Sequence, residues 1–143
     1  MIWDLHCHIA GANLIGRTPE ERLTQLIATA NRFGIERLCV SMGTKFSRDP
    51  APETIRKQND EVLRAISKYP ERAFGFVYLN PKHVDTALAE LDRIVANGPM
   101  VGVKLWTAQR ASAPELDPII KRTMRAWEQG AKDPSDLCFP LHG

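Results

Sequence analysis

The sequence has few of the residues that build disulfide frameworks or surfaces for polyanions. Its 143 residues contain three cysteines, Cys7, Cys39 and Cys138, an odd number without close spacing. Two of them lie inside apolar runs, which predicts buried thiols in a reducing compartment rather than paired disulfides. Lysine and arginine total 19 against 17 acidic residues. This near balance gives no indication of a nucleic-acid or membrane partner.

Long hydrophobic runs are also missing. No apolar stretch approaches the roughly 20 residues that a membrane-spanning helix needs. Asp4 and His6 interrupt the first apolar run, so the amino terminus does not resemble a secretory signal peptide. The sequence therefore predicts a soluble cytoplasmic protein, and its length is that of one ordinary domain with a sizeable core.

Apolar runs alternate with segments that have the apolar spacing of helices. The predicted strands are residues 2–9, 37–42, 73–79, 100–106 and 137–141. The predicted helices are at about residues 18–33, 53–68 and 85–96, with a fourth from near residue 117 to residue 130. This alternation favours right-handed βαβ units and a parallel sheet covered by helices. It does not by itself distinguish an open sheet from a closed barrel, although the first connection, residues 10–13, lacks a dinucleotide-binding glycine pattern.

The first predicted strand carries three polar residues at alternating positions, Asp4, His6 and His8. Because side chains alternate between the faces of a strand, these three are expected on one face. The side chains expected on the other face are Trp3, Leu5 and Cys7. Two imidazoles so placed can point at one divalent ion, although alternating histidines can equally form hydrogen bonds on a half-polar strand. Asp4 is expected to orient a histidine or to bond a neighbouring strand.

The carboxyl ends of the predicted strands carry further polar candidates, and in parallel α/β folds this is where the chemistry lies. These candidates are residues 42–45, residues 79–83, Lys104, Trp106 and His142. All of them could converge with the two histidines at one end of the sheet. His83 is expected to be a solvated loop residue. The loop cations Lys45, Arg48 and Lys82 could attract an acidic substrate, but isolated loop cations are expected to face water.

An ordered set of motifs resembles the amidohydrolase superfamily, in particular the amidohydrolase-related branch that includes aminocarboxymuconate-semialdehyde decarboxylase. The motifs are Asp-x-His-x-His at residues 4–8, Asn59–Val62, residues 69–81 and Gly102–Leu105. The resemblance covers about residues 1–121. It implies a distorted (β/α)8 TIM barrel, of which this sequence contains about five of the eight strands. It also implies a metal-dependent hydrolase or decarboxylase with a small-molecule substrate.

By this resemblance, His6 and His8 correspond to the first two metal ligands and His142 to a third, with zinc as the expected ion. Such an ion lowers the pKa of bound water far below that of bulk water, toward about 7, for attack on a C–N or C–O bond or for hydration-linked decarboxylation. Lys104 stands where binuclear relatives carry a carbamylated lysine, and here we expect it to contact substrate or to form a structural ion pair. Pro140 departs from the family's fifth strand, so His142 is either a ligand in an altered strand or part of a divergent terminus.

A complete barrel of this type needs about 250 residues, and the expected strand-six histidine and strand-eight aspartate have no counterparts here. We predict one partial barrel domain over residues 1–143, with a divergent or truncated terminus over residues 128–143. Three hypotheses stay open: a fragment of a metal-dependent enzyme, a non-catalytic remnant that binds metal or a partner, and a non-functional truncation. Open edge strands would favour self-association into a homo-oligomer.

Overall fold

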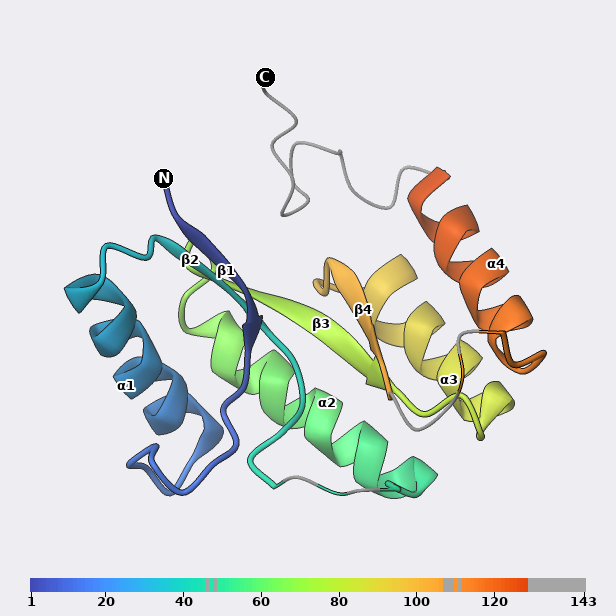
Figure 1. The fold of residues 1–143 in the computed structure, drawn as a ribbon, viewed down its shortest axis with the longest axis horizontal. Helices are drawn as coiled ribbons and strands as arrows, with labels where there is room; N and C mark the ends of the chain where they lie inside the picture. The colour runs from blue at the N-terminus through green and yellow to red at the C-terminus, as the bar shows by residue number, and fades with distance from the viewer. Residues whose placement is uncertain (46, 48, 107–109, 111, 129–143) are drawn as a thin grey trace.

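A computed structural model describes residues 1–45, 47, 49–106, 110 and 112–128. Four strands form one sheet in the order β1-β2-β3-β4, with every neighbouring pair parallel. The elements in chain order are β1 (Trp3–Cys7), α1 (Pro19–Arg32), β2 (Arg37–Val40), α2 (Pro52–Ser67), β3 (Ala73–Leu79), α3 (Val84–Leu91), η1 (Asp92–Ala96), β4 (Gly102–Leu105) and α4 (Leu116–Glu128). The sheet is a curled half-barrel with its helices outside (Figure 1). The predicted fifth strand, residues 137–141, lies outside the described residues.

Local signals in the sequence explain where the helices lie. Thr18 caps α1 because its hydroxyl accepts a hydrogen bond from the Glu21 amide at 3.2 Å, and the Glu21 carboxylate reaches back to the Thr18 amide. Pro19 occupies the first helical position, where a missing N–H is harmless. The helix predicted over residues 85–96 is present, but its last turn widens into the π-helical segment η1. No helix in the described ranges is long and apolar enough to cross a membrane.

The main core fills the space between the sheet and its helices. Strand side chains on this outer face, such as Leu38, Val40 and Val77, are almost fully buried. One polar side chain also lies in this layer: Asn59 of α2 bonds both backbone groups of Tyr78 in β3, at 2.8 and 3.1 Å, and the Glu90 carboxylate at 3.0 Å. Asn59 therefore ties α2 to β3 and α3 by hydrogen bonds that apolar packing alone would not supply.

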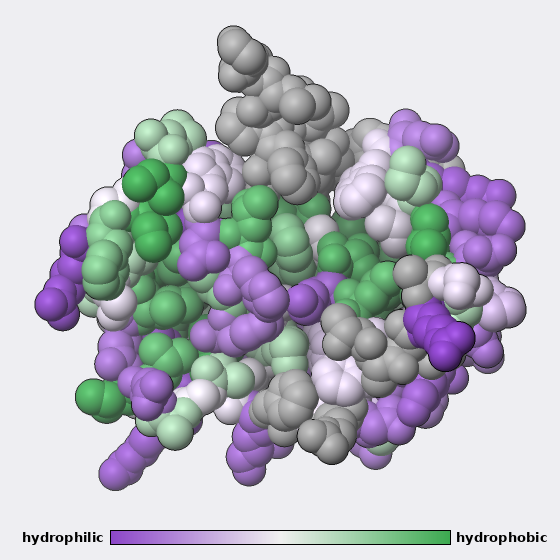
Figure 2. All heavy atoms as spheres, viewed as in Figure 1, coloured by the Kyte–Doolittle hydropathy of each residue, from purple (hydrophilic) through white to green (hydrophobic). Residues whose placement is uncertain are grey.

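The other face of the sheet is the inner face of the half-barrel. Trp3 stacks on Phe74 there, with ring centroids 5.7 Å apart. Figure 2 shows apolar atoms on this face around a group of hydrophilic atoms in its middle, and hydrophilic atoms along much of its rim. Apolar side chains are also exposed on the edge strand β1, at Leu5, and on α4, at Met124 and Trp127. The described strands thus leave apolar surface of the kind that a closed barrel buries.

Candidate metal centre

A β-bulge in the first strand sets the direction of the histidines. Between Asp4 and Cys7, three residue steps of β1 match two steps of β2. Cys7 consequently packs in the outer core, whereas Trp3 packs on the inner face. The prediction that these two side chains share a face was wrong, because the extra residue reverses the alternation beyond it. The Oδ1 atom of Asp4 accepts a hydrogen bond from the His6 amide at 3.0 Å, so this carboxylate helps to hold the bulge.

The side chains of His6, within the bulge, and of His8, beyond it, converge. Their Nε2 atoms are 2.9 Å apart, and the two rings stand nearly perpendicular with centroids 4.8 Å apart. Two nitrogen ligands of one tetrahedral zinc ion, each at about 2.0–2.1 Å, lie about 3.3 Å from each other. The observed separation is that of a hydrogen bond between the rings, and an opening of about 0.4 Å would let the same two atoms share one ion.

The β2 strand end fixes which nitrogen of His8 is available. The Nδ1 atom of His8 lies 2.8 Å from the backbone carbonyl of Ser41, and the Ser41 hydroxyl is 3.4 Å away. A carbonyl only accepts hydrogen bonds, so Nδ1 must carry the proton. In the neutral ring, Nε2 is then left with its lone pair. Metal-bound histidines are oriented in this way by a carbonyl behind the ring.

The predicted candidate Lys104 lies at the same place. It projects from β4, and its Nζ atom is 3.4 Å from the Nε2 atom of His6. The positive charge of Lys104, followed by the proximity of His8 and by burial, lowers the pKa of His6, while Asp4 acts in the opposite direction. The neutral form of His6, which is the form that binds metals, is therefore favoured. Among the described residues Lys104 forms no ion pair with a carboxylate, so the predicted structural ion pair is not found there.

Other predicted candidates lie elsewhere. Lys82 pairs with the Asp49 carboxylate at 2.9 Å, and this contact is the main reason why the pKa of Asp49 is lowered. His83 precedes α3, where its carbonyl accepts a hydrogen bond from Ala87. His142 lies outside the described residues, so its role stays a prediction. In the described part of the chain, no third histidine, cysteine or acidic residue groups with His6 and His8.

Two residues near the centre were missed by the sequence reasoning. Ser41 acts through its main-chain carbonyl, which every residue type has, so no sequence signal marks it. Tyr78 is the cross-strand partner of Lys104, and its ring meets Trp106 edge-on at 6.4 Å. Its hydroxyl is buried with no hydrogen-bond partner in the described chain, and burial raises its pKa to about 12. Tyr78 sits in a predicted strand, where an aromatic residue indicates packing first.

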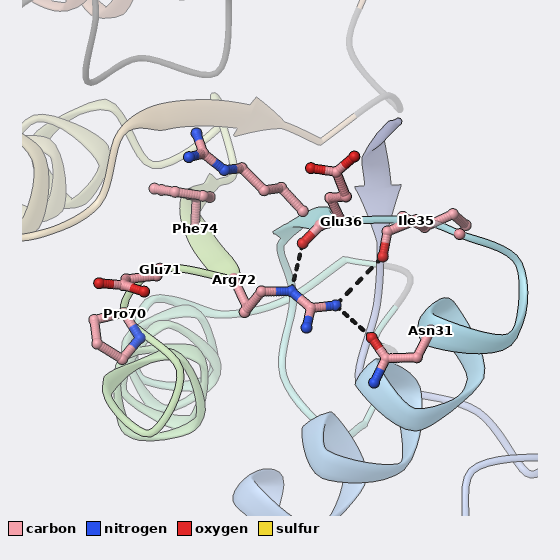
Figure 3. A pocket seen from close by; sticks show the side chains of 9 residues that line it. Asn31, Ile35, Glu36, Pro70, Glu71, Arg72 and Phe74 are labelled. Atoms are coloured by element: carbon pink, nitrogen blue, oxygen red, sulfur yellow. Dashed lines mark hydrogen bonds between the residues drawn. The ribbon is translucent and has the colours of Figure 1, made fainter. Parts of the chain in front are cut away.

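A surface pocket lies at the amino-terminal ends of β2 and β3 (Figure 3). Arg72 points across it and donates hydrogen bonds to the carbonyls of Glu36 and Ile35 and to the side chain of Asn31. These bonds fasten the turn between α1 and β2. The histidine pair lies at the carboxyl end of β1, so this pocket is at the opposite end of the sheet. In barrels of this type that end serves stability rather than chemistry.

Comparisons with known proteins find solved structures that share the fold of this chain. No protein-family model matches the chain, and no curated protein does. The solved structure of 2,6-dihydroxybenzoate decarboxylase complexed with 2,6-dihydroxybenzoate is 23% identical, with a TM-score of 0.59, over 71% of this chain and 36% of that one. The decarboxylase of that name from Rhizobium is 21% identical, with a TM-score of 0.61 and the same coverage.

This chain has the fold of part of a TIM barrel. The predicted parallel (β/α) barrel class is therefore confirmed, and the chain spans about a third of the length of these solved structures. Identities of 23% and 21% show the shared fold, and membership of the amidohydrolase superfamily and of a branch within it stays a prediction.

Proposed function

We propose that this chain is the metal-binding part of a decarboxylase-like enzyme of the amidohydrolase-related family. His6 and His8 hold a divalent ion, preferably zinc, through their Nε2 atoms. The observation that carries the proposal is the convergence of these two atoms to 2.9 Å while the Ser41 carbonyl holds His8 from behind. A carbonyl behind the ring, as at His8, is the arrangement that orients metal-bound histidines.

The side chains around the pair suit a small acidic substrate. A bound divalent ion would supply Lewis acidity at the two imidazoles. Lys104 places an ammonium group 3.4 Å from His6 with no carboxylate paired to it in the described chain, so an incoming carboxylate can take that place. Tyr78, the cross-strand partner of Lys104, meets the ring of Trp106 just after β4 edge-on, so the neighbourhood of the ammonium group is apolar. A carboxylate-bearing substrate favours decarboxylation over hydrolysis.

A second candidate is a metal-binding module without catalysis. It is favoured by the donor count, because the described residues bring two imidazoles together and no third ligand of the histidine, cysteine or carboxylate type. Two protein ligands are fewer than the three that catalytic zinc sites usually have. His142 is the proposed third ligand from this chain.

Metal content tests the proposal. We expect native mass spectrometry to find one zinc ion on the 143-residue chain, and the His6→Ala, His8→Ala double variant to lose it. His83→Ala is the matched control, because it removes a histidine that does not belong to the pair, and it should keep the ion. His142→Ala should weaken zinc binding at least 10-fold if His142 is a ligand. A double variant that retains stoichiometric zinc would refute the site.

Carbon dioxide release separates the two candidates. With zinc bound, we expect slow decarboxylation of 2,6-dihydroxybenzoate as a probe substrate, and a loss of 10-fold or more in Lys104→Met. Lys82→Met, which removes a cation already paired with Asp49, is the control and should retain the rate. Zinc binding without any carbon dioxide release would support the non-catalytic module instead.

A further inference from the structure

The loop that follows β2 holds one residue in an unusual backbone conformation. Met42 has a φ angle of 64°, in the left-handed region that residues with a Cβ atom seldom adopt. Its side chain is buried and packs with Ile55 and Tyr78. A conformation of this kind persists only where the surroundings hold it.

Two polar side chains of α2 hold this loop. The Oε2 atom of Glu61 accepts hydrogen bonds from the Thr44 amide at 2.7 Å and from the Thr44 hydroxyl at 2.9 Å. The Oε1 atom of Gln58 accepts a weaker one from the Gly43 amide at 3.4 Å. Glu61 is only 9% exposed and forms no ion pair in the described chain. The hydrogen-bond partners that the structure gives to this buried carboxylate are thus donors of the loop.

The loop also lies too close to α2 for a larger residue. A Cβ atom added at Gly43 would be 2.4 Å from the Oε2 atom of Glu61 and 2.8 Å from the Cα atom of Gln58. Real Cβ atoms are essentially never found at such distances. The contact between Gly43 and α2 is therefore tight, and we expect an added side chain at Gly43 to displace the loop.

We infer that Glu61 is a positioning residue for His8. The carbonyl of Ser41 belongs to the peptide unit that ends at the Met42 nitrogen, so its direction depends on the φ angle of Met42. While Glu61 holds Thr44, that carbonyl points at the Nδ1 atom of His8 from 2.8 Å. If the loop is released, Met42 can relax to a negative φ, which turns this peptide over and takes the carbonyl away from His8.

Loss of this contact would change which nitrogen of His8 carries the proton, and not only the position of the ring. Without the Ser41 carbonyl, the neutral imidazole can place its proton on either nitrogen, and a proton on Nε2 blocks the atom that faces His6. Glu61 would therefore act on the metal site through the loop without touching the metal. This role in metal binding rests on the proposed function, whereas the hydrogen-bond relay does not.

The tautomer of His8 can be measured without metal. In the metal-free chain at about pH 8, where free imidazole is neutral, ¹⁵N chemical shifts of labelled histidine distinguish a proton on Nδ1 from one on Nε2. We expect His8 to carry its proton on Nδ1 in the unaltered chain and to become a mixture in Glu61→Ala. Glu61→Gln keeps an oxygen acceptor and should keep the tautomer.

Glu90→Ala is the matched control, because Glu90 is an equally buried carboxylate that bonds Asn59 and Arg93 away from the loop. It should leave His8 unchanged even where it lowers stability. Gly43→Ala adds a Cβ atom on the loop side of the contact with α2. It should displace the loop and reproduce the effect of Glu61→Ala. If Glu61→Ala does not fold, Gly43→Ala decides whether the loop sets the tautomer of His8. Thr44→Val removes only the hydroxyl donor and should shift the His8 tautomer in the same direction by a smaller amount.

Zinc affinity gives the second readout. Residues that orient metal ligands typically change affinity about 10–100-fold, so we expect Glu61→Ala to weaken zinc binding about 10-fold and Glu90→Ala to leave it unchanged. Folded Glu61→Ala, Gly43→Ala or Thr44→Val chains in which His8 still carries its proton on Nδ1 would overturn the inference. If the unaltered chain binds no zinc, the proposed function fails, while the tautomer measurement still decides the role of Glu61.

Discussion

At the scale of single residues, the centre depends on groups that control two imidazoles rather than on the imidazoles alone. The Ser41 carbonyl fixes the proton of His8, and Lys104 lowers the pKa of His6. The first effect leaves a lone pair on Nε2 of His8, and the second favours the neutral ring of His6. The sequence predicted the histidines and Lys104, because residue type and strand position are visible in it. It could not predict Ser41, whose contribution comes from the main chain.

Replacing Lys104 should change the titration of His6. Lys104→Met removes the positive charge that disfavours the imidazolium ion, so the pKa of His6 should rise toward its usual value near 6.5. Protons would then compete with metal at higher pH than in the unaltered chain. NMR titration of the His6 ring measures this directly. Lys82→Met is the control and should leave His6 unchanged, and an unmoved His6 pKa in Lys104→Met would show that the two groups are not close in solution.

At the scale of elements, one irregular strand and one helix do most to build the site. The β1 bulge turns the histidines inward together, and α2 carries the polar side chains that hold β3 and the β2–α2 loop. Apolar spacing predicted the position of α2 and the bounds of β3, residues 73–79, correctly. The bulge was missed because it depends on the register between β1 and β2. The alternation of apolar and polar residues in β1 does not show that register. Asn59 and Glu61 were not recognised as buried, because apolar spacing marks only apolar residues as buried.

Removing the central polar side chain of α2 should destabilise the fold. Asn59→Ala takes away three hydrogen bonds and leaves buried backbone groups of Tyr78 unpaired. We expect the free energy of unfolding to fall by about 2–4 kcal/mol, since each unsatisfied buried group costs roughly 1–3 kcal/mol. Urea denaturation followed by circular dichroism measures the loss. Lys57→Ala, an exposed position on the same helix, should change stability by less than about 0.5 kcal/mol, and an equally small effect of Asn59→Ala would contradict the assigned role.

At the scale of the whole molecule, four parallel strands and their helices form a half-barrel whose histidine pair lies at the carboxyl end of β1. The alternation of strands and helices predicted this architecture, and the solved decarboxylase structures share the fold over 71% of the chain. Alternation did not reveal how strongly the sheet curls, because curvature arises from packing between elements. The fifth strand and His142 fall outside the described residues, so these predictions stay open.

The exposed apolar side chains on the edge strand β1 and on α4 predict self-association. Leu5 is 43% exposed on β1, and Trp127 is 39% exposed on α4. We expect sedimentation velocity to show a mass that rises with protein concentration, and Trp127→Lys to shift the equilibrium toward the monomer. Phe33→Lys, at an exposed residue just beyond α1, is the control and should leave the equilibrium in place. A constant monomer mass over the whole concentration range would refute the prediction.

The central claim is that His6 and His8 share one metal ion through their Nε2 atoms. The most direct measurement is the ¹⁵N spectrum of histidine-labelled chain titrated with zinc. The account predicts that the Nε2 resonances of His6 and His8 shift together and saturate at one equivalent, while Nδ1 of His8 keeps its proton and His83 does not move. Coordination through Nδ1 of His8, or spectra of both residues that zinc leaves unchanged, would contradict it.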